Sequence, residues 1–111
     1  MARLDDYRAY IQQVLKKYGA YKPAVGDVEM ETIVDAVGDH YQLVSAGWHD
    51  LERIYGCIVH IDIKGDKVWI QHDGTDVGIA NELVALGIPK EDIVLGFHAP
   101  YKRPYTGFAV N

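Results

Sequence analysis

The stretch from residue 53 to residue 72 constrains the fold most, because it holds two strand-like runs around one tight turn. The runs RIYGCIVHIDI and KVWIQH are rich in β-branched and aromatic residues, which favour extended strands. Lys64, Gly65 and Asp66 lie between the two runs and are typical of a tight hairpin turn. The sequence therefore predicts an antiparallel hairpin.

A two-residue loop at Gly65 and Asp66 also sets the register of this hairpin. The chemically matching pairs are then Ile63 with Val68 and Ile61 with Ile70. By the period of two, one apolar face collects Cys57, Val59, Ile61 and Ile63. The other face collects His60, Asp62, Trp69 and Gln71.

The amino-terminal half adds one helix and a second hairpin. Apolar residues at three- and four-residue steps from Leu4 to Tyr18 predict an amphipathic helix, which a left-handed cap at Gly19 should end. Residues 28–37 and 40–48 both have strand character, and Gly38 with Asp39 supplies a turn between them.

The carboxyl-terminal third predicts a short helix and a last strand. Thr75 is the expected N-cap of a helix formed by IANELVAL, which Gly87 ends. Pro89 suits the start of one more helical turn, and IVLGF then has the pattern of a buried strand. Residues 98–107 have no helical period, so we expect an ordered loop laid over the domain.

Together these elements predict the α+β class. We expect a single domain over residues 1–111, with a mostly antiparallel sheet of four or five strands. The N-terminal helix and the second helix should pack on one face of that sheet. Strand order does not follow from the sequence.

Charge and cysteine content narrow the function classes. The 111 residues carry a formal net charge of -5, which disfavours autonomous DNA binding. Cys57 is the single cysteine and cannot form an intramolecular disulfide, which fits a reducing cytoplasm. The sequence contains no run of about 18 apolar residues, so no membrane span is predicted.

The best enzyme candidate is the tract Asp62-Ile63-Lys64. Metal-dependent nucleases with a (D/E)-x-K core use this spacing, together with an acid from upstream. Glu29, Glu31 or Asp35 could supply that acid. The alternative is that Asp62 is a strand-end aspartate beside a turn lysine without catalytic function, because so short a motif often occurs by chance.

No metal or cofactor site is predicted. His60 and Asp62 share a face, but the expected register puts His72 on the opposite one, so the three do not converge. Ser45 is the only serine, and Cys57 should point into the core, so neither is an activated nucleophile. No phosphate-binding glycine motif is present.

The tail is the best candidate for a binding surface. It places two cations among aromatic rings and prolines, a composition typical of protein interfaces. The candidate partner-binding residues are Trp69, Phe97, His98, Tyr101, Lys102, Arg103 and Tyr105. The alternatives are a purely structural strap over the core and a contact with nucleic acid. The ring content and the frequency of two-fold pairs also fit a homodimer.

Several tracts over nearly the whole chain carry a resemblance to a known family. They are residues 39–43, 47–48, 53–57, 60–64, 69–71 and, above all, 87–98, continued by Pro100, Arg103, Thr106, Ala109 and Val110. On these tracts the chain resembles the XisI-like family, named for the controlling factor of fdxN element excision in heterocyst-forming cyanobacteria. One departure lies at residues 73–78, where the family pattern has Glu at 76 and a polar residue at 78.

The resemblance implies a function without catalytic residues. It implies a controlling factor of site-specific DNA element excision, acting with a companion, XisH, whose family is nuclease-like. Association with DNA and with the recombinase would then be indirect. The alternatives are that the protein is the antitoxin-like half of a toxin-antitoxin type pair, or that it is a metal-dependent nuclease that uses Asp62 and Lys64.

Overall fold

The computed structural model describes residues 2–21, 26–76 and 78–111 of the chain. The elements in chain order are α1 (Ala2–Gly19), β1 (Asp27–Asp35), β2 (His40–His49), β3 (Glu52–Lys64), β4 (Lys67–Asp73), α2 (Ile79–Leu86) and β5 (Ile93–Leu95). Two 3₁₀ helices, Lys90–Asp92 and Pro100–Tyr105, precede and follow β5. In these ranges no helix combines the length and the hydropathy needed to cross a bilayer.

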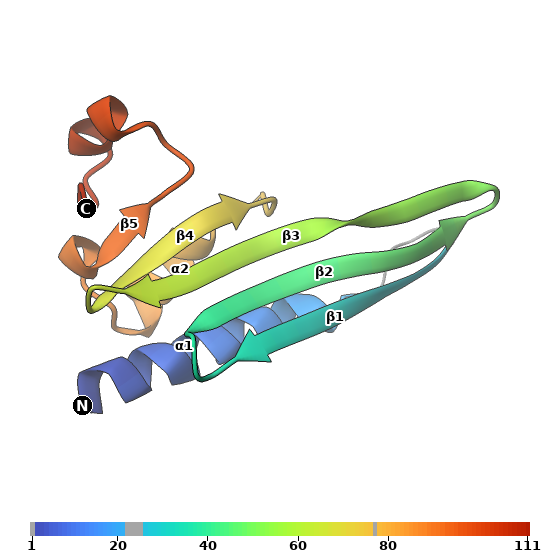
Figure 1. Ribbon diagram of the computed structural model, residues 1–111, viewed down its shortest axis with the longest axis horizontal. Coiled ribbons are helices and arrows are strands. Elements are labelled where there is room, and N and C mark those ends of the chain that lie inside the picture. Colours follow the sequence, from blue (N-terminus) through green and yellow to red (C-terminus); the bar gives the residue numbers. More distant parts are fainter. Residues whose placement is uncertain (1, 22–25, 77) are drawn as a thin grey trace.

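The five strands form one sheet in the order β1-β2-β3-β4-β5 (Figure 1). The first four run antiparallel as successive hairpins, and β5 lies parallel to β4. The connection from β4 to β5 contains α2, because parallel neighbours cannot be joined by a tight turn. The predicted α+β class and mostly antiparallel sheet are confirmed, as are the pairs Ile63–Val68 and Ile61–Ile70.

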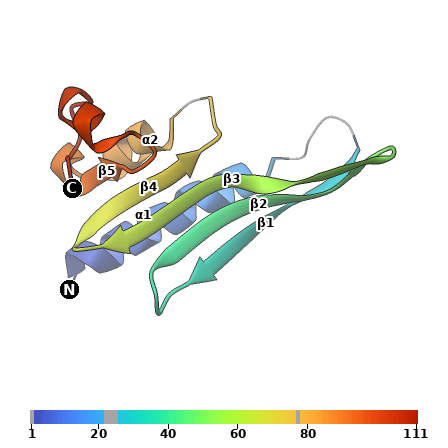
Figure 2. The same ribbon diagram turned by 45° about the horizontal axis from the view of Figure 1, so that its top comes forward.

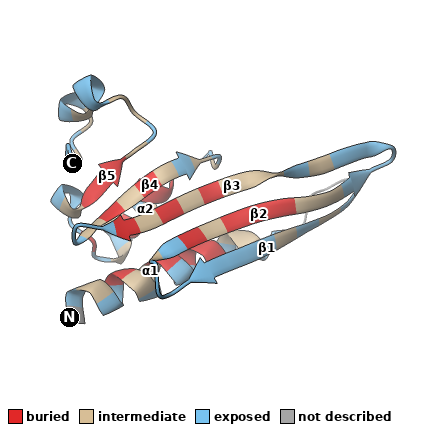
Figure 3. Ribbon diagram, viewed as in Figure 1, coloured by how far each residue is buried: buried red, intermediate tan, exposed pale blue. Residues whose placement is uncertain are grey.

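Both helices pack on the same face of the sheet (Figure 2). The apolar side chains of the helices pack against those of the central strands. The buried residues that result are coloured red in Figure 3. The fully buried side chains include Ile11 and Leu15 of α1, Leu83 of α2, and Leu43 and Ile61 of the sheet. Each contributes roughly 1.5–3 kcal/mol by leaving water, so this layer carries most of the stabilisation.

Helix α1 is held to the first hairpin by an ion pair. Arg8 Nε lies 2.8 Å from Asp39 Oδ1, and Arg8 Nη2 lies 3.1 Å from Oδ2. The buried Tyr41 hydroxyl donates to the same carboxylate over 3.0 Å. The Arg8 guanidinium therefore holds the pKa of Asp39 below its ordinary value. These bonds fix the turn that leads directly into His40.

The end of α1 differs from the prediction. The helix continues through Gly19, which does not adopt a left-handed conformation. A Cβ at Gly19 would lie 3.3 Å from Thr32 Oγ1 and 3.4 Å from Leu43 Cδ1. The predicted left-handed cap is wrong, and the glycine instead lets the helix end approach the sheet closely.

Two β-bulges change which face some side chains take. Leu43 pairs with Val59 and Val44 pairs with Cys57, so Ile58 is an extra residue in β3. The alternation reverses there, and the Cys57 thiol lies 3.9 Å from Gln42 Nε2 rather than in the core. The prediction that Cys57 shares the apolar face of Val59 is therefore wrong.

The start of α2 also differs from the prediction. Asp73 accepts hydrogen bonds from the Thr75 amide over 2.9 Å and from the Ile79 amide over 2.8 Å. The helix begins only at Ile79, behind Gly78, so Thr75 is not its N-cap. The predicted end at Gly87 is confirmed, with its φ of 125°.

Candidate functional site

Among the described residues, the face of the sheet opposite α1 and α2 carries no α-helix, and the 3₁₀ helix Pro100–Tyr105 reaches it at Trp69 (Figure 2). We call it the open face. Strand alternation places on it His40 and Gln42 of β2, Cys57, His60, Asp62 and Lys64 of β3, and Trp69 and Gln71 of β4. The predicted grouping of His60, Asp62, Trp69 and Gln71 on one face is confirmed by their pairing and by the bonds below.

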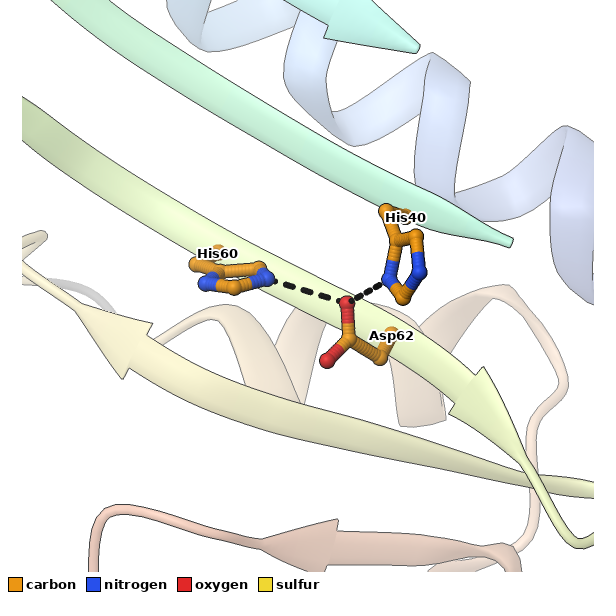
Figure 4. Close-up of side chains that lie close together, drawn as sticks. All are labelled: His40, His60 and Asp62. Carbon is orange, nitrogen blue, oxygen red and sulfur yellow. Dashed lines mark hydrogen bonds and ion pairs between the residues drawn. The ribbon is translucent and has the colours of Figure 1, made fainter. Parts of the chain in front are cut away.

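The polar centre of the open face is a histidine-aspartate cluster (Figure 4). His40 Nδ1 lies 2.8 Å from Asp62 Oδ1, and His60 Nε2 lies 2.9 Å from the same oxygen. The Gln71 amide donates to Asp62 Oδ2 over 3.2 Å. His40 and Asp62 are directly opposite residues of β2 and β3, so the backbone itself brings them together.

These contacts shift two ionisation equilibria. Burial acts to raise the pKa of Asp62, but the hydrogen bonds from His40, His60 and Gln71 outweigh it and leave that pKa below its ordinary value. The Asp62 carboxylate in turn raises the pKa of His40. The cluster therefore favours an ionised aspartate at neutral pH.

The regular register predicted from the sequence put His72 on the face opposite His60 and did not single out His40. A bulge at Gln71 instead pairs His60 directly with His72, so the prediction that His72 lies on the opposite face is wrong. Even so, among the described residues the only group of three or more histidine, cysteine or acidic side chains whose ligand atoms all lie within 4.8 Å of one another is His40, His60 and Asp62. The strand character of residues 40–48 was visible in the sequence, but the pairing of His40 with Asp62 was not.

The tail contributes a second group around the half-buried Trp69. The Lys64 ammonium lies 4.1 Å from the centre of the Trp69 ring, and the Arg103 guanidinium lies 5.2 Å from it. Arg103 Nε donates to the His98 carbonyl over 3.1 Å, which holds the guanidinium in place. The predicted link between Trp69 and the tail is thus present as a direct contact.

The other predicted binding residues lie on or beside the 3₁₀ helix Pro100–Tyr105. The prediction that the tail contains no helix is therefore wrong. A helix of six residues is too short to produce a visible helical period in the sequence. Tyr101 is 73% exposed and Tyr105 is 89% exposed. The rings of Phe97 and His98 are 4.7 Å apart, and Lys102 is exposed. We call the set Trp69, Phe97, His98, Tyr101, Lys102, Arg103 and Tyr105 the tail surface.

A second exposed aromatic group lies at the far end of the β2–β3 hairpin and was not predicted. The Arg53 guanidinium lies 5.5 Å from the Trp48 ring centre and 5.7 Å from that of Tyr55. Tyr55 is 71% exposed. The aromatic residues of this segment are visible in the sequence, but the sequence did not show that they lie together on one face.

The nuclease arrangement is not assembled in the described residues. Lys64 packs on the Trp69 ring. Oδ1 of Asp62 contacts both His40 and His60. None of Glu29, Glu31 and Asp35 joins Asp62 in a group of metal-type ligands. Burial raises the pKa of the Cys57 thiol, so this residue is not an activated nucleophile.

Comparison with known proteins places the chain in a family. The family model described as "XisI protein" matches residues 1–110. The chain belongs to the XisI family. A crystal structure of a XisI-like protein from Anabaena variabilis ATCC 29413 is 44% identical, with a TM-score of 0.91 over 97% of this chain and 99% of that one. No curated protein matches the sequence.

A second solved structure carries a functional name. The fdxN element excision controlling factor XisI from Anabaena variabilis ATCC 29413 is 36% identical to this chain, with a TM-score of 0.84. The match covers 98% of this chain and 99% of that one. The resemblance noted from the sequence is thereby confirmed for the family and for the fold.

Proposed function

We propose that this XisI-family protein is a cytoplasmic, non-catalytic factor that controls excision of a DNA element by binding an XisH-type protein. Support for excision control comes from the name of the similar Anabaena factor. Support for protein binding comes from the tail surface, where exposed tyrosines stand beside an arginine that is already held in place. That juxtaposition is the observation on which the proposal depends.

The tail surface has the properties of an interface centre. Tyrosine and arginine are the side chains that most often carry binding energy, and Tyr101 and Tyr105 are free to be buried by a partner. Arg103 is held by the His98 carbonyl and packs near Trp69, so little side-chain entropy would be lost on binding. Lys102 and Arg103 would favour a partner with an acidic patch, within a chain of net charge -5.

Replacing Tyr101 and Arg103 together with alanine should weaken binding to an XisH-type companion about thirtyfold. Loss of an interface anchor typically costs about 2 kcal/mol, which corresponds to that factor. Titration of the labelled companion with each purified variant measures the change. Tyr55→Ala is the matched control, since its ring is equally exposed but lies on the distant hairpin end.

Circular dichroism and thermal unfolding must accompany this titration, because Arg103 also makes contacts within the chain. Tyr101→Ala alone removes an exposed ring and should leave the melting temperature unchanged. If the double variant is folded and binds as tightly as the parent, the tail surface is not the partner site. If Tyr55→Ala weakens binding instead, the interface lies at the hairpin end.

The non-catalytic assignment predicts that the pure protein does not cleave DNA. Incubation with supercoiled DNA and Mg²⁺ or Mn²⁺ should leave the plasmid intact, because the described acids do not assemble an oxygen-rich site around Asp62. Gel electrophoresis reads out nicked and linear products. Cleavage that disappears with Asp62→Ala would instead establish a nuclease.

A further inference from the structure

We propose that His40, His60 and Asp62 form a Zn²⁺ site on the open face of the sheet. Two imidazole nitrogens and one carboxylate oxygen from β2 and β3 lie within 4.8 Å of one another. This juxtaposition comes from strand pairing and not from a sequence motif, since His40 and Asp62 are 22 residues apart. The site does not depend on the proposed excision function.

The geometry needs only a small adjustment to hold an ion. Zn²⁺ ligands bind at about 2.0–2.1 Å, so two of them at a tetrahedral angle lie about 3.4 Å apart. The present separations from Asp62 Oδ1 are 2.8 Å for His40 Nδ1 and 2.9 Å for His60 Nε2. Each nitrogen must therefore move by about 0.5 Å, which a side-chain rotation can provide.

The ligand types select the class of metal. Imidazole with a single carboxylate suits Zn²⁺ and its neighbours in the first transition row, whereas Mg²⁺ and Ca²⁺ require oxygen ligands throughout. Three protein ligands leave one tetrahedral position to water or an exogenous group. His40 has 57% of its side chain exposed, so that position is open to solvent.

The surroundings of the cluster orient the aspartate and supply negative charge. The Gln71 amide holds the second oxygen of Asp62, the type of outer contact that fixes a metal-binding carboxylate. The Asp35 carboxylate lies beside His40, because Asp35 and His40 face each other across the β1–β2 pair. The ligands themselves stand on paired strands, which restrict their positions more than loops would.

The test is calorimetric titration of chelator-treated, tag-free protein with Zn²⁺. We expect one ion per chain and a higher melting temperature with Zn²⁺ present, because an ion bound only by the folded state stabilises it. His40→Ala removes a direct ligand and should weaken Zn²⁺ binding by at least about 100-fold, the upper end of the loss seen for residues that only support a ligand. Co²⁺ serves as a second probe, whose visible absorption should appear with the parent and be lost with His40→Ala.

Matched controls separate this site from incidental binding by surface histidines. His72→Ala removes an exposed histidine from the neighbouring strand and should leave the affinity unchanged. His40→Gln is a second variant that keeps a polar side chain at an exposed position. Binding of Zn²⁺ that survives both His40→Ala and His40→Gln, or that His72→Ala abolishes, would overturn the proposal, as would the absence of binding to the parent.

Discussion

Ile61→Ala should lower the free energy of unfolding by about 3.5 kcal/mol. Ile61 is fully buried on β3, where it pairs with Ile70 and belongs to the core cluster beneath the two helices. Removing its larger side chain forfeits the transfer energy and leaves a cavity that the surrounding sheet and helix cannot fill. Urea unfolding monitored by circular dichroism measures the loss.

Ile33→Ala is the control for this substitution. Ile33 is also an isoleucine on a strand of the same sheet, but it is 47% exposed on the edge strand β1. Its replacement should cost less than about 1 kcal/mol, because little packing is lost there. Equal losses for the two variants would mean that the layer between the helices and the central strands is not the main source of stability.

Gly47→Ala should destabilise the protein by about 3 kcal/mol. A Cβ at this position would lie 2.0 Å from the Asp27 carbonyl oxygen and 2.6 Å from the Val28 Cα. Both atoms belong to the backbone of β1, which cannot rotate away as a side chain could. The alanine can be accommodated only if β1 separates from β2 at this end, with loss of ladder hydrogen bonds.

Gly56→Ala tests whether this effect comes from the close approach or from glycine loss in general. Gly56 lies on β3 opposite Ser45, and a Cβ there would meet nothing within 4 Å. The variant should be neutral or slightly more stable, since alanine restricts the unfolded chain. Hydrogen exchange of the β1 amides should become faster in Gly47→Ala and stay unchanged in Gly56→Ala.

Local sequence patterns were sufficient to predict part of each candidate site. The turn at Gly65 and Asp66 fixed the pairing of Ile61 with Ile70, because a two-residue loop leaves one register and the buried face admits no slip. The same alternation grouped Asp62 with Trp69 and Gln71 correctly. Tail residues were recognised as one segment by their composition, although their 3₁₀ conformation was not.

The sequence by itself determined the family, the α+β class, the first helix and the central hairpin. Each follows from information within a short window, such as an apolar period or a tight turn, or from tracts that match a family pattern. The helix stripe from Leu4 to Tyr18 and the end of α2 at Gly87 are of this kind. Local steric and apolar preferences are enough to decide such features.

Only the tertiary structure decided which distant residues meet. The bulge at Ile58 moved Cys57 out of the core, and the bulge at Gln71 placed His72 directly opposite His60. Pairing of β2 with β3 brought His40 to Asp62, and the path of the tail brought Arg103 to Trp69. These placements depend on how the twisted sheet fits against α1 and α2, which no single segment of the sequence specifies.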